Sequence, residues 1–200
     1  MPRPPKNTRE QVLNQTRQQL LQAAAEEFAG RGYSGANINR ISQAAGFAKG
    51  TIYNHFPSKR ALMLALIDAI GAAHVDFVLE RVEPEEEPVR RLERFFSAGF
   101  DFVEQHPTQA RVVINAVYGP DDEFQERIYQ TYERLFTLIM QDIVGAGIAQ
   151  GDFRPIDANL STALLMTIYL GSCSLLDAGG NIWLQPDQVA NFVLQGLVQR

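Results

Sequence analysis

The chain has 200 residues, of which 46% are hydrophobic and 20% charged, so it can bury a core in one large or two small domains. Its one cysteine, Cys173, excludes an internal disulfide and fits a cytoplasmic location. The first six residues lack the apolar stretch of a signal peptide. The uncharged run 158–176 is barely of membrane-spanning length and contains several polar residues, so a buried or dimer-forming helix is the better interpretation.

The formal net charge of −5 argues against a nucleic-acid partner until its distribution is considered. Residues 1–60 hold nine Lys/Arg and three Asp/Glu, which gives +6. Residues 61–200 hold the other nine Lys/Arg and twenty Asp/Glu, which gives −11. A basic first segment on an acidic remainder is the asymmetry expected when one domain meets phosphates.

The first expected helix follows a basic, proline-rich segment, residues 2–7, which we expect to be disordered in the free protein. Capping-box patterns at 8–11 and at 16–19 can each start this helix, and the second pattern fits better. Gly32 ends it. The arm formed by Arg3, Lys6 and Arg9 either reaches a DNA minor groove or only aids solubility.

Two short helices are expected next. Asn37 is a suitable N-cap for a helix whose apolar residues recur at helical spacing over 38–45. Gly46 fits the turn that follows, and Pro57 stops a second helix. Ile52 and Phe56 pack inward from this second helix, which leaves a polar outer side made by Lys49, Thr51, Tyr53, Asn54 and His55. A helix-turn-helix places its second helix in the DNA major groove in this way.

This stretch resembles the DNA-binding segment of the TetR family of bacterial transcriptional regulators. The similar residues run from Ile41 to Leu62, with further similarity at 20–24 and 28–33. The resemblance covers about the first third of the chain. It implies a three-helix DNA-binding domain, and it implies that the family positions at the DNA correspond to Lys49, Gly50, Thr51, Tyr53, His55 and Lys59.

The residue types in this segment suit DNA. Lys49 can donate to guanine O6 and N7, and Gly50 lets the backbone approach closely. Thr51 can reach a base methyl group or a phosphate. The remaining phosphate or base candidates are Tyr53, Asn54, His55 and Lys59, with Asn37 and Asn39 as further phosphate candidates where many relatives have Thr and Arg. The alternative, a polar helix face without function, is disfavoured by the charge asymmetry and by the resemblance.

The rest of the chain predicts helices separated by clear breaks. Ser58 caps a helix that runs to about Arg81, and the proline- and glutamate-rich segment 83–88 is a loop. We expect further helices up to Pro107, over 107–118, over 121–150 with a disturbance near Gly145 and Gly147, over 157–177, and from Pro186 onward, with a turn at Gly179-Gly180. No strand alternation is visible, so the expected fold is all-α.

The aromatic-rich second part can be simple core, which is the commoner outcome for any one residue. The TetR family, however, uses this domain to bind a small-molecule inducer and to dimerise. Pocket walls resemble core in sequence, because both are mostly apolar. The residues we expect to line a pocket are Phe96, Phe100, Tyr118, Tyr132, Met140, Met166, Tyr169 and Cys173.

The last two helices are the expected dimer contact, since their counterparts in the family pair across a two-fold axis. Small residues on the first of them allow a close helix approach, and an apolar stripe lies on the second. An exposed apolar face of this size would be unusual in a monomer. The residues concerned are Ala163, Gly171, Ser174, Val189, Phe192, Val193 and Leu197.

No enzyme chemistry emerges. The order of Ala48-Lys49-Gly50-Thr51 is wrong for a phosphate loop, the three histidines are too far apart for a local metal motif, and no nucleophile-elbow pattern is present. We therefore expect no cofactor and no metal.

The sequence predicts a DNA-binding domain over 1–58 and a larger helical ligand-binding and dimerisation domain over 59–200. The helix after Ser58 connects them. The expected function is that of a cytoplasmic homodimeric repressor that binds a palindromic operator and is released by a small apolar or aromatic inducer. The alternative is a helical small-molecule-binding dimer that activates transcription or has another role.

Overall fold

The computed structural model describes residues 6–175 and 181–198, and these residues are almost entirely helical. An antiparallel bridge joins Phe153 and Val198, and the described residues form no strand. The predicted all-α fold is confirmed. The turn predicted at 179–180 lies outside the described residues. The elements are α1 (Lys6–Gly35), α2 (Ile38–Ala44), η1 (Thr51–Asn54), α3 (Lys59–Val82), α4 (Pro88–Gln105), α5 (Pro107–Val117), α6 (Asp122–Thr131), α7 (Glu133–Thr137), η2 (Leu138–Gly145), α8 (Ala146–Gln150), α9 (Ala158–Ser174) and α10 (Pro186–Leu197).

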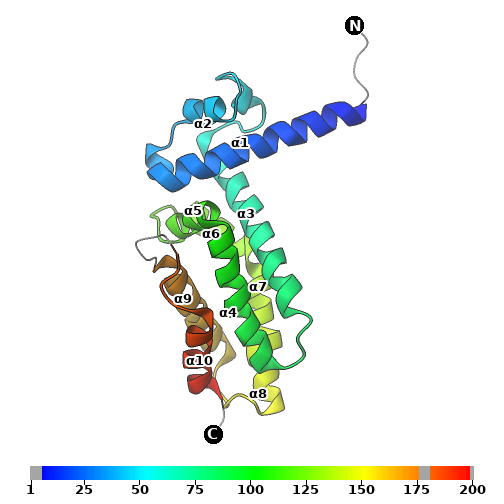
Figure 1. Ribbon diagram of the computed structural model, residues 1–200, viewed down its shortest axis with the longest axis vertical. Helices are drawn as coiled ribbons and strands as arrows, with labels where there is room; N and C mark the ends of the chain where they lie inside the picture. Colours follow the sequence, from blue (N-terminus) through cyan, green and yellow to red (C-terminus); the bar gives the residue numbers. More distant parts are fainter. Residues whose placement is uncertain (1–5, 176–180, 199–200) are drawn as a thin grey trace.

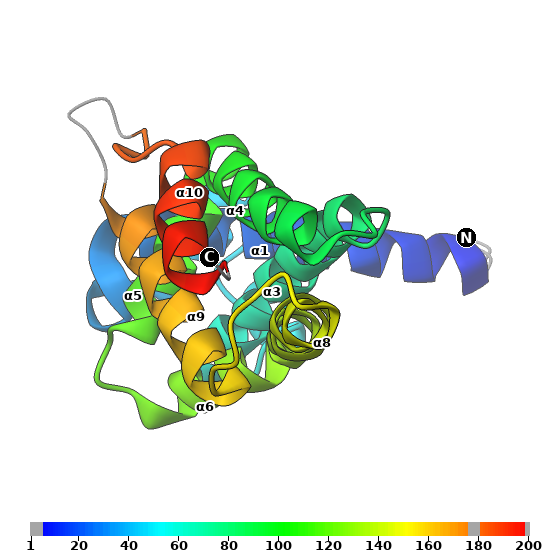
Figure 2. The same ribbon diagram turned by 90° about the horizontal axis from the view of Figure 1, so that it is seen from below.

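The molecule has a small head and a larger body joined by α3 (Figure 1). The head consists of α1, α2 and η1, and α1 crosses the start of α3. The body consists of α4 to α10, with α4 beside α3 and with α9 and α10 next to each other in both views (Figures 1 and 2). The start of α1 projects away from the rest of the molecule, and its residues 10–15 are exposed.

The helix boundaries follow from caps and breakers that the sequence displays. The side-chain oxygens of Asn37, Ser58 and Asp157 accept backbone N–H groups at the starts of α2, α3 and α9. Proline occupies the first turn of α4, α5 and α10, where no N–H is needed. Gly32 breaks α1 with a φ of 65°, a conformation that favours glycine.

Three expectations about these elements are corrected. The first helix begins at Lys6 rather than near residue 16, so segment 6–15 extends it. The second motif helix is a short 3₁₀ helix, Thr51–Asn54. The long helix expected over 121–150 is interrupted at Tyr132 and continues as a π-helical stretch, Leu138–Gly145. The break at Tyr132 precedes the glycines that were expected to disturb the helix.

The core runs continuously from head to body, because α3 contributes to both. Its buried residues recur along one face from Leu62 to Val82. By length and composition α3 could span a membrane, with a mean hydropathy of 1.9 over its most apolar window, but 56% of that window is buried inside the protein. The apolar character of α3 is thus explained by its place as the central helix.

Candidate functional site

The segment after α2 presents polar groups outward from a buried base. Ile52 is fully buried and Phe56 is 2% exposed, so the two residues hold the segment against the head. Thr51 and His55 are half-buried. The exposed residues of this surface, which we call the recognition turn, are Lys49, Gly50, Tyr53 and Asn54.

The turn between α2 and η1 is fixed by short-range hydrogen bonds. The Ser42 hydroxyl donates to the carbonyl of Ala48 over 2.8 Å, and the Phe47 N–H donates to the Ser42 carbonyl over 2.9 Å. Gly46 has a φ of 81°, which a residue with a side chain rarely adopts. The backbone therefore delivers the recognition turn at a defined angle to α2.

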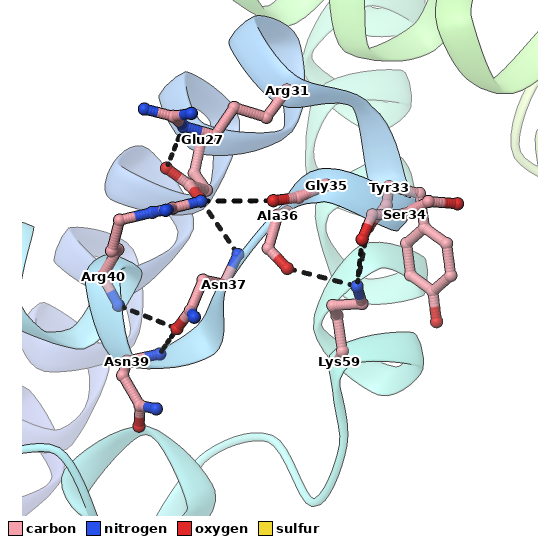
Figure 3. A network of polar contacts seen from close by, with 10 residues as sticks. All are labelled: Glu27, Arg31, Tyr33, Ser34, Gly35, Ala36, Asn37, Asn39, Arg40 and Lys59. Atoms are coloured by element: carbon pink, nitrogen blue, oxygen red, sulfur yellow. Dashed lines mark hydrogen bonds and ion pairs between the residues drawn. The ribbon is translucent and has the colours of Figure 1, made fainter.

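Glu27 of α1 ties α2 to the first helix (Figure 3). Its Oε1 accepts the Asn37 N–H over 2.9 Å and the Arg40 guanidinium over 2.6 Å, and Arg31 lies 3.5 Å from its Oε2. Burial alone would raise the pKa of Glu27, but the Arg40 and Asn37 hydrogen bonds outweigh burial and lower it. The carboxylate thus stays charged and holds the two helices in register.

Asn37 and Asn39 stand at the start of α2. The Asn37 side-chain oxygen accepts the N–H of Asn39 over 2.9 Å and that of Arg40 over 3.4 Å, so it acts as the N-cap. Asn37 is exposed, whereas Asn39 is half-buried. The predicted phosphate contacts of both asparagines stay predictions, and Asn37 has a structural role beside them.

Lys59, the first residue of α3, bonds to the end of α1 (Figure 3). Its ammonium group donates to the carbonyls of Tyr33 at 2.8 Å and of Ser34 and Ala36 at 3.2 Å. These carbonyls belong to the chain after the break at Gly32, so Lys59 fastens the exit of α1 to the start of α3. Its predicted place at a DNA phosphate stays a prediction.

Arg60 connects the head to the body. Its guanidinium is bonded to both oxygens of Asp121, at 3.1 and 2.8 Å, and to the carboxylate of Glu123. It also lies 5.1 Å from the centre of the Phe124 ring, which packs edge-on against Tyr33 at 4.8 Å. The N-terminal end of α6 is therefore attached to the head by an ion pair and an aromatic contact.

A cavity of about 140 Å³ lies inside the body between α3, α4, α5, α6 and α9. Its wall is mostly apolar and aromatic. It reaches the surface at Tyr129, which is 66% exposed. The residues that line it include Ile70, His74, Phe102, Val113, Ile114, Gln125, Ile128, Tyr129, Tyr132, Phe136, Met166, Tyr169, Leu170 and Cys173.

His74 is the polar centre of this wall. Its Nδ1 lies 3.0 Å from the Tyr132 hydroxyl and its Nε2 lies 2.9 Å from the Tyr169 hydroxyl. The ring of Phe102 stacks on the imidazole with centroids 4.4 Å apart. Burial lowers the pKa of His74 to about 4, and nearby His106 adds to the shift, so the imidazole is neutral at pH 7.

Two glycines make room for the two tyrosines. A Cβ at Gly99 would lie 2.5 Å from the Tyr169 hydroxyl oxygen, and a Cβ at Gly71 would lie 3.1 Å from Cε2 of the Tyr132 ring. Both distances are shorter than ordinary carbon contacts. The absence of side chains on α3 and α4 at these points therefore determines where the tyrosines sit.

Four of the eight expected pocket residues line this cavity, namely Tyr132, Met166, Tyr169 and Cys173. Phe96 and Phe100 lie outside it, because they are fully buried behind Tyr169, with ring centres 6.4 and 6.2 Å from that of Tyr169. Tyr118, which follows the end of α5, is 62% exposed. Met140 is half-buried in the π-helical stretch and does not line the cavity.

Similarity to known proteins agrees with this arrangement. Residues 20–66 match the model of the bacterial regulatory proteins of the tetR family. The chain is 27% identical over 147 residues to the HTH-type transcriptional repressor KstR2 of Mycobacterium tuberculosis, an alignment that covers 72% of each chain. It is 25% identical over 158 residues to the nucleoid occlusion factor SlmA of Vibrio cholerae, covering 78% of this chain and 81% of SlmA.

Among solved structures, the transcriptional regulator FadR of Bacillus subtilis in complex with stearoyl-CoA superposes with a TM-score of 0.78 at 20% identity. The superposition covers 91% of this chain and 97% of FadR, so the likeness extends through head and body. Residues 20–66 thus carry the DNA-binding segment of the tetR family of bacterial regulatory proteins. The similar repressor KstR2 is a transcriptional regulator of the helix-turn-helix type, and FadR, which has the same fold, is a regulator that binds stearoyl-CoA.

Some residues of this site have no clear signal in the sequence. The Glu27–Arg40 and Arg60–Asp121 pairs join residues 13 and 61 positions apart, and charged residues of this kind occur throughout the chain. His74 did carry a signal. It follows Ile67, Ile70 and Gly71 at the spacing of the buried face of α3, where a polar residue needs a partner.

A matched pair of lysine variants separates folding from DNA contact in the head. Lys59→Met removes the cation that three carbonyls share, so we expect the free energy of unfolding to fall by about 1–3 kcal/mol. Lys49→Met removes the same charge from an exposed position, so its effect on stability should stay within about 0.5 kcal/mol. Urea denaturation of both variants measures this difference. Equal stability of the two variants would contradict the role of Lys59 in holding the end of α1 against the start of α3.

His74 should make the free energy of unfolding depend on pH between about 6.5 and 4. Its pKa is lower in the folded state, so the unfolded chain binds the proton first and stability falls as the pH drops through this window. The slope is at most about 1.4 kcal/mol per pH unit. His74→Gln should flatten it between pH 7 and 5, measured by urea denaturation. Glu27 and Asp121, whose pKa values are also lowered, act below this range. An unchanged slope in the variant would show that His74 is not responsible.

Proposed function

We propose that the protein is a homodimeric repressor whose recognition turns bind a palindromic operator and which leaves the operator when a small, mostly apolar ligand fills the body cavity. The observation that carries the proposal is the recognition turn itself. It exposes Lys49, Gly50, Tyr53 and Asn54 above two buried anchors, within the segment 1–60 that carries a net charge of +6. An exposed lysine beside a glycine allows close approach to a base edge, and an exposed tyrosine and asparagine suit phosphates.

Two elements support communication between cavity and head. Helix α3 carries Lys59 and Arg60 at its start and Ile70 and His74 in the cavity wall. Helix α6 is bonded to Arg60 at its N-terminal end, while Tyr132 lies in the cavity wall at its C-terminal end. A ligand that displaces Tyr132 therefore acts on a helix whose other end is attached to the head.

The energetic requirement for release is modest. The two recognition turns of a dimer must bind the two halves of the operator at the same time, and these halves lie about 34–36 Å apart or at a multiple of that spacing. A ligand that prefers a protomer arrangement with another spacing weakens DNA binding by its difference in affinity for the two arrangements. A typical coupling of about 1–3 kcal/mol changes operator affinity about 5- to 150-fold.

The dimer contact is proposed on the outer face of α9, with part of α10. On α9, Leu160 is 61% and Leu164 is 55% exposed, and Ala163, Thr167 and Ser174 continue the same exposed stripe. Gly171 is half-buried on this side. On α10, Phe192 is 72% exposed. Large apolar side chains at this spacing are typical of a helix that packs against a partner.

The structure corrects the set of α10 residues expected in the dimer contact. Val189, Val193 and Leu197 are only 6–8% exposed and belong to the core of the protomer, where α10 packs on α4. Of the expected stripe, Phe192 alone faces outward. The expected stripe combined the apolar inner face of α10 with Phe192, the one large apolar residue on its otherwise polar outer face.

DNA binding should depend on Lys49. We expect Lys49→Ala to weaken binding to a duplex from the DNA beside the protein's own gene by about 1–3 kcal/mol and to reduce the preference for that duplex over a scrambled one. Arg81→Ala is the matched control, because it also removes one exposed positive charge but at the far end of α3. Fluorescence anisotropy at fixed salt measures both. Equal losses in the two variants would contradict a specific role of the recognition turn. A reporter gene behind the same duplex distinguishes repression from activation.

The oligomeric state tests the proposed contact. Leu164→Glu combined with Phe192→Glu places two charges in the proposed interface while changing only exposed residues, so sedimentation velocity should show a monomer. Leu13→Glu, at a residue of α1 that is 48% exposed, is the control and should remain a dimer. A dimer that survives the double change would place the contact elsewhere.

A further inference from the structure

The Tyr132–His74–Tyr169 chain defines the chemistry of the cavity beyond its apolar character. We propose that the cavity takes an uncharged ligand with one ketone or alcohol oxygen, and that this oxygen forms a hydrogen bond with the hydroxyl of Tyr132. This rests on the proposed function only in treating the cavity as the effector site.

Counting the protons in the Tyr132–His74–Tyr169 hydrogen-bond chain shows that one hydroxyl proton remains available to a ligand. A neutral imidazole has one N–H donor and one acceptor nitrogen. Of the two tyrosine hydroxyls bonded to His74, one donates its proton and the other accepts the N–H. The accepting hydroxyl keeps a proton that the chain does not use. One hydroxyl proton is therefore left over, at whichever tyrosine accepts from His74.

The two ends of the chain differ in their surroundings. At the Tyr169 end, the buried thiol of Cys173 interacts with the hydroxyl, and Gly99 packs directly against it. Burial raises the pKa of that thiol to about 12, so it stays protonated and can donate or accept only weakly. At the other end, Tyr132 lines the cavity as Tyr169 does, but among the described residues His74 is the one hydrogen-bond partner of the Tyr132 hydroxyl. The unused hydrogen-bonding capacity is thus directed to the cavity at Tyr132.

The Tyr132 hydroxyl can bond to either a ketone or an alcohol oxygen. When Tyr169 donates its proton to His74, Tyr132 accepts the imidazole N–H and can donate its own proton to a ketone. When the chain is reversed, Tyr132 donates to His74 and its oxygen can accept from an alcohol. Reversal requires only hydroxyl rotation and the other imidazole tautomer.

A charged ligand has no partner in this wall. Among the described residues that line the cavity, none is Asp, Glu, Lys or Arg. His74 stays neutral, so it supplies no positive charge for a carboxylate. Burying an unpaired ion costs far more than burying a hydrogen-bonded neutral group. The wall therefore selects against acids of the same shape.

The size of the cavity points to a ligand portion about as large as one aromatic ring with a short substituent. An apolar cavity of about 150 Å³ in another protein binds benzene, and this cavity measures about 140 Å³. A larger ligand would extend past Tyr129, where the wall reaches the surface.

Four probes that share a phenyl ring test this inference on the full-length protein by isothermal titration calorimetry, and three of them have nearly equal planar shapes. Acetophenone carries the ketone, isopropenylbenzene replaces the carbonyl oxygen by a CH₂ group, benzoate carries a negative charge, and phenyltrimethylammonium carries a positive one. Acetophenone should bind about fivefold or more tightly than isopropenylbenzene, because it gains one hydrogen bond. Neither ion should bind as tightly as acetophenone.

Tyr132→Phe should abolish the preference for the ketone and leave isopropenylbenzene binding nearly unchanged, since the ring remains. Tyr118→Phe, at an exposed residue outside the cavity, should keep the preference. Equal binding of ketone and alkene by the wild type, tighter binding of either ion, or a preference that survives Tyr132→Phe would overturn the inference. So would the absence of binding by all four probes at millimolar concentration.

Operator affinity measured with the same probes separates this inference from the proposed function. If acetophenone binds through Tyr132 and operator affinity does not change, the ligand chemistry stands and the release mechanism is contradicted. If an apolar compound releases the operator but no ketone preference is found, the release mechanism stands and the ligand chemistry is contradicted.

Discussion

The structure depends on α3, because one continuous helix takes part in both the head and the body. Its first turn is bonded to the end of α1 through Lys59 and to α6 through Arg60. About three to four turns further along, its buried face reaches Ile70 and His74 in the cavity wall. The same helix therefore contacts both the cavity and the head, and this is the connection on which the proposed release mechanism rests.

The opposite charges of head and body meet where the two parts are joined. Arg60 belongs to the basic first segment, and Asp121 and Glu123 belong to the acidic remainder. The pair with Asp121 lowers the pKa of this carboxyl group mainly through the hydrogen bond from Arg60. Because these groups are partly exposed to solvent, their attraction contributes modestly to stability and weakens with salt. The joint is thus a contact that can be broken at small cost, as the proposed release mechanism requires.

Local sequence patterns predicted most of the fold, and long-range contacts account for what they missed. Asn37, Ser58, Pro88, Pro107 and Pro186 mark helix ends by chemistry that acts over three or four residues, so these boundaries could be read from the sequence. The break of α6 at Tyr132 could not, because the hydroxyl of this tyrosine is bonded to His74, 58 residues earlier in the chain. The same reason explains why half of the expected pocket residues lie elsewhere. Periodicity shows that Phe96 and Phe100 are buried, but not which side of Tyr169 they occupy.

The body cavity also has a consequence for the volume of the protein. The partly open cavity of about 140 Å³ disappears when the chain unfolds, and whatever part of it water does not fill makes the unfolded state smaller in volume. Volume decreases on unfolding are typically about 20–100 mL/mol and scale with the voids that are lost. The empty regulator should therefore be sensitive to hydrostatic pressure, with its body as the weak part. A ligand that fills the cavity would remove this weakness, so the occupied body should be less compressible than the empty one.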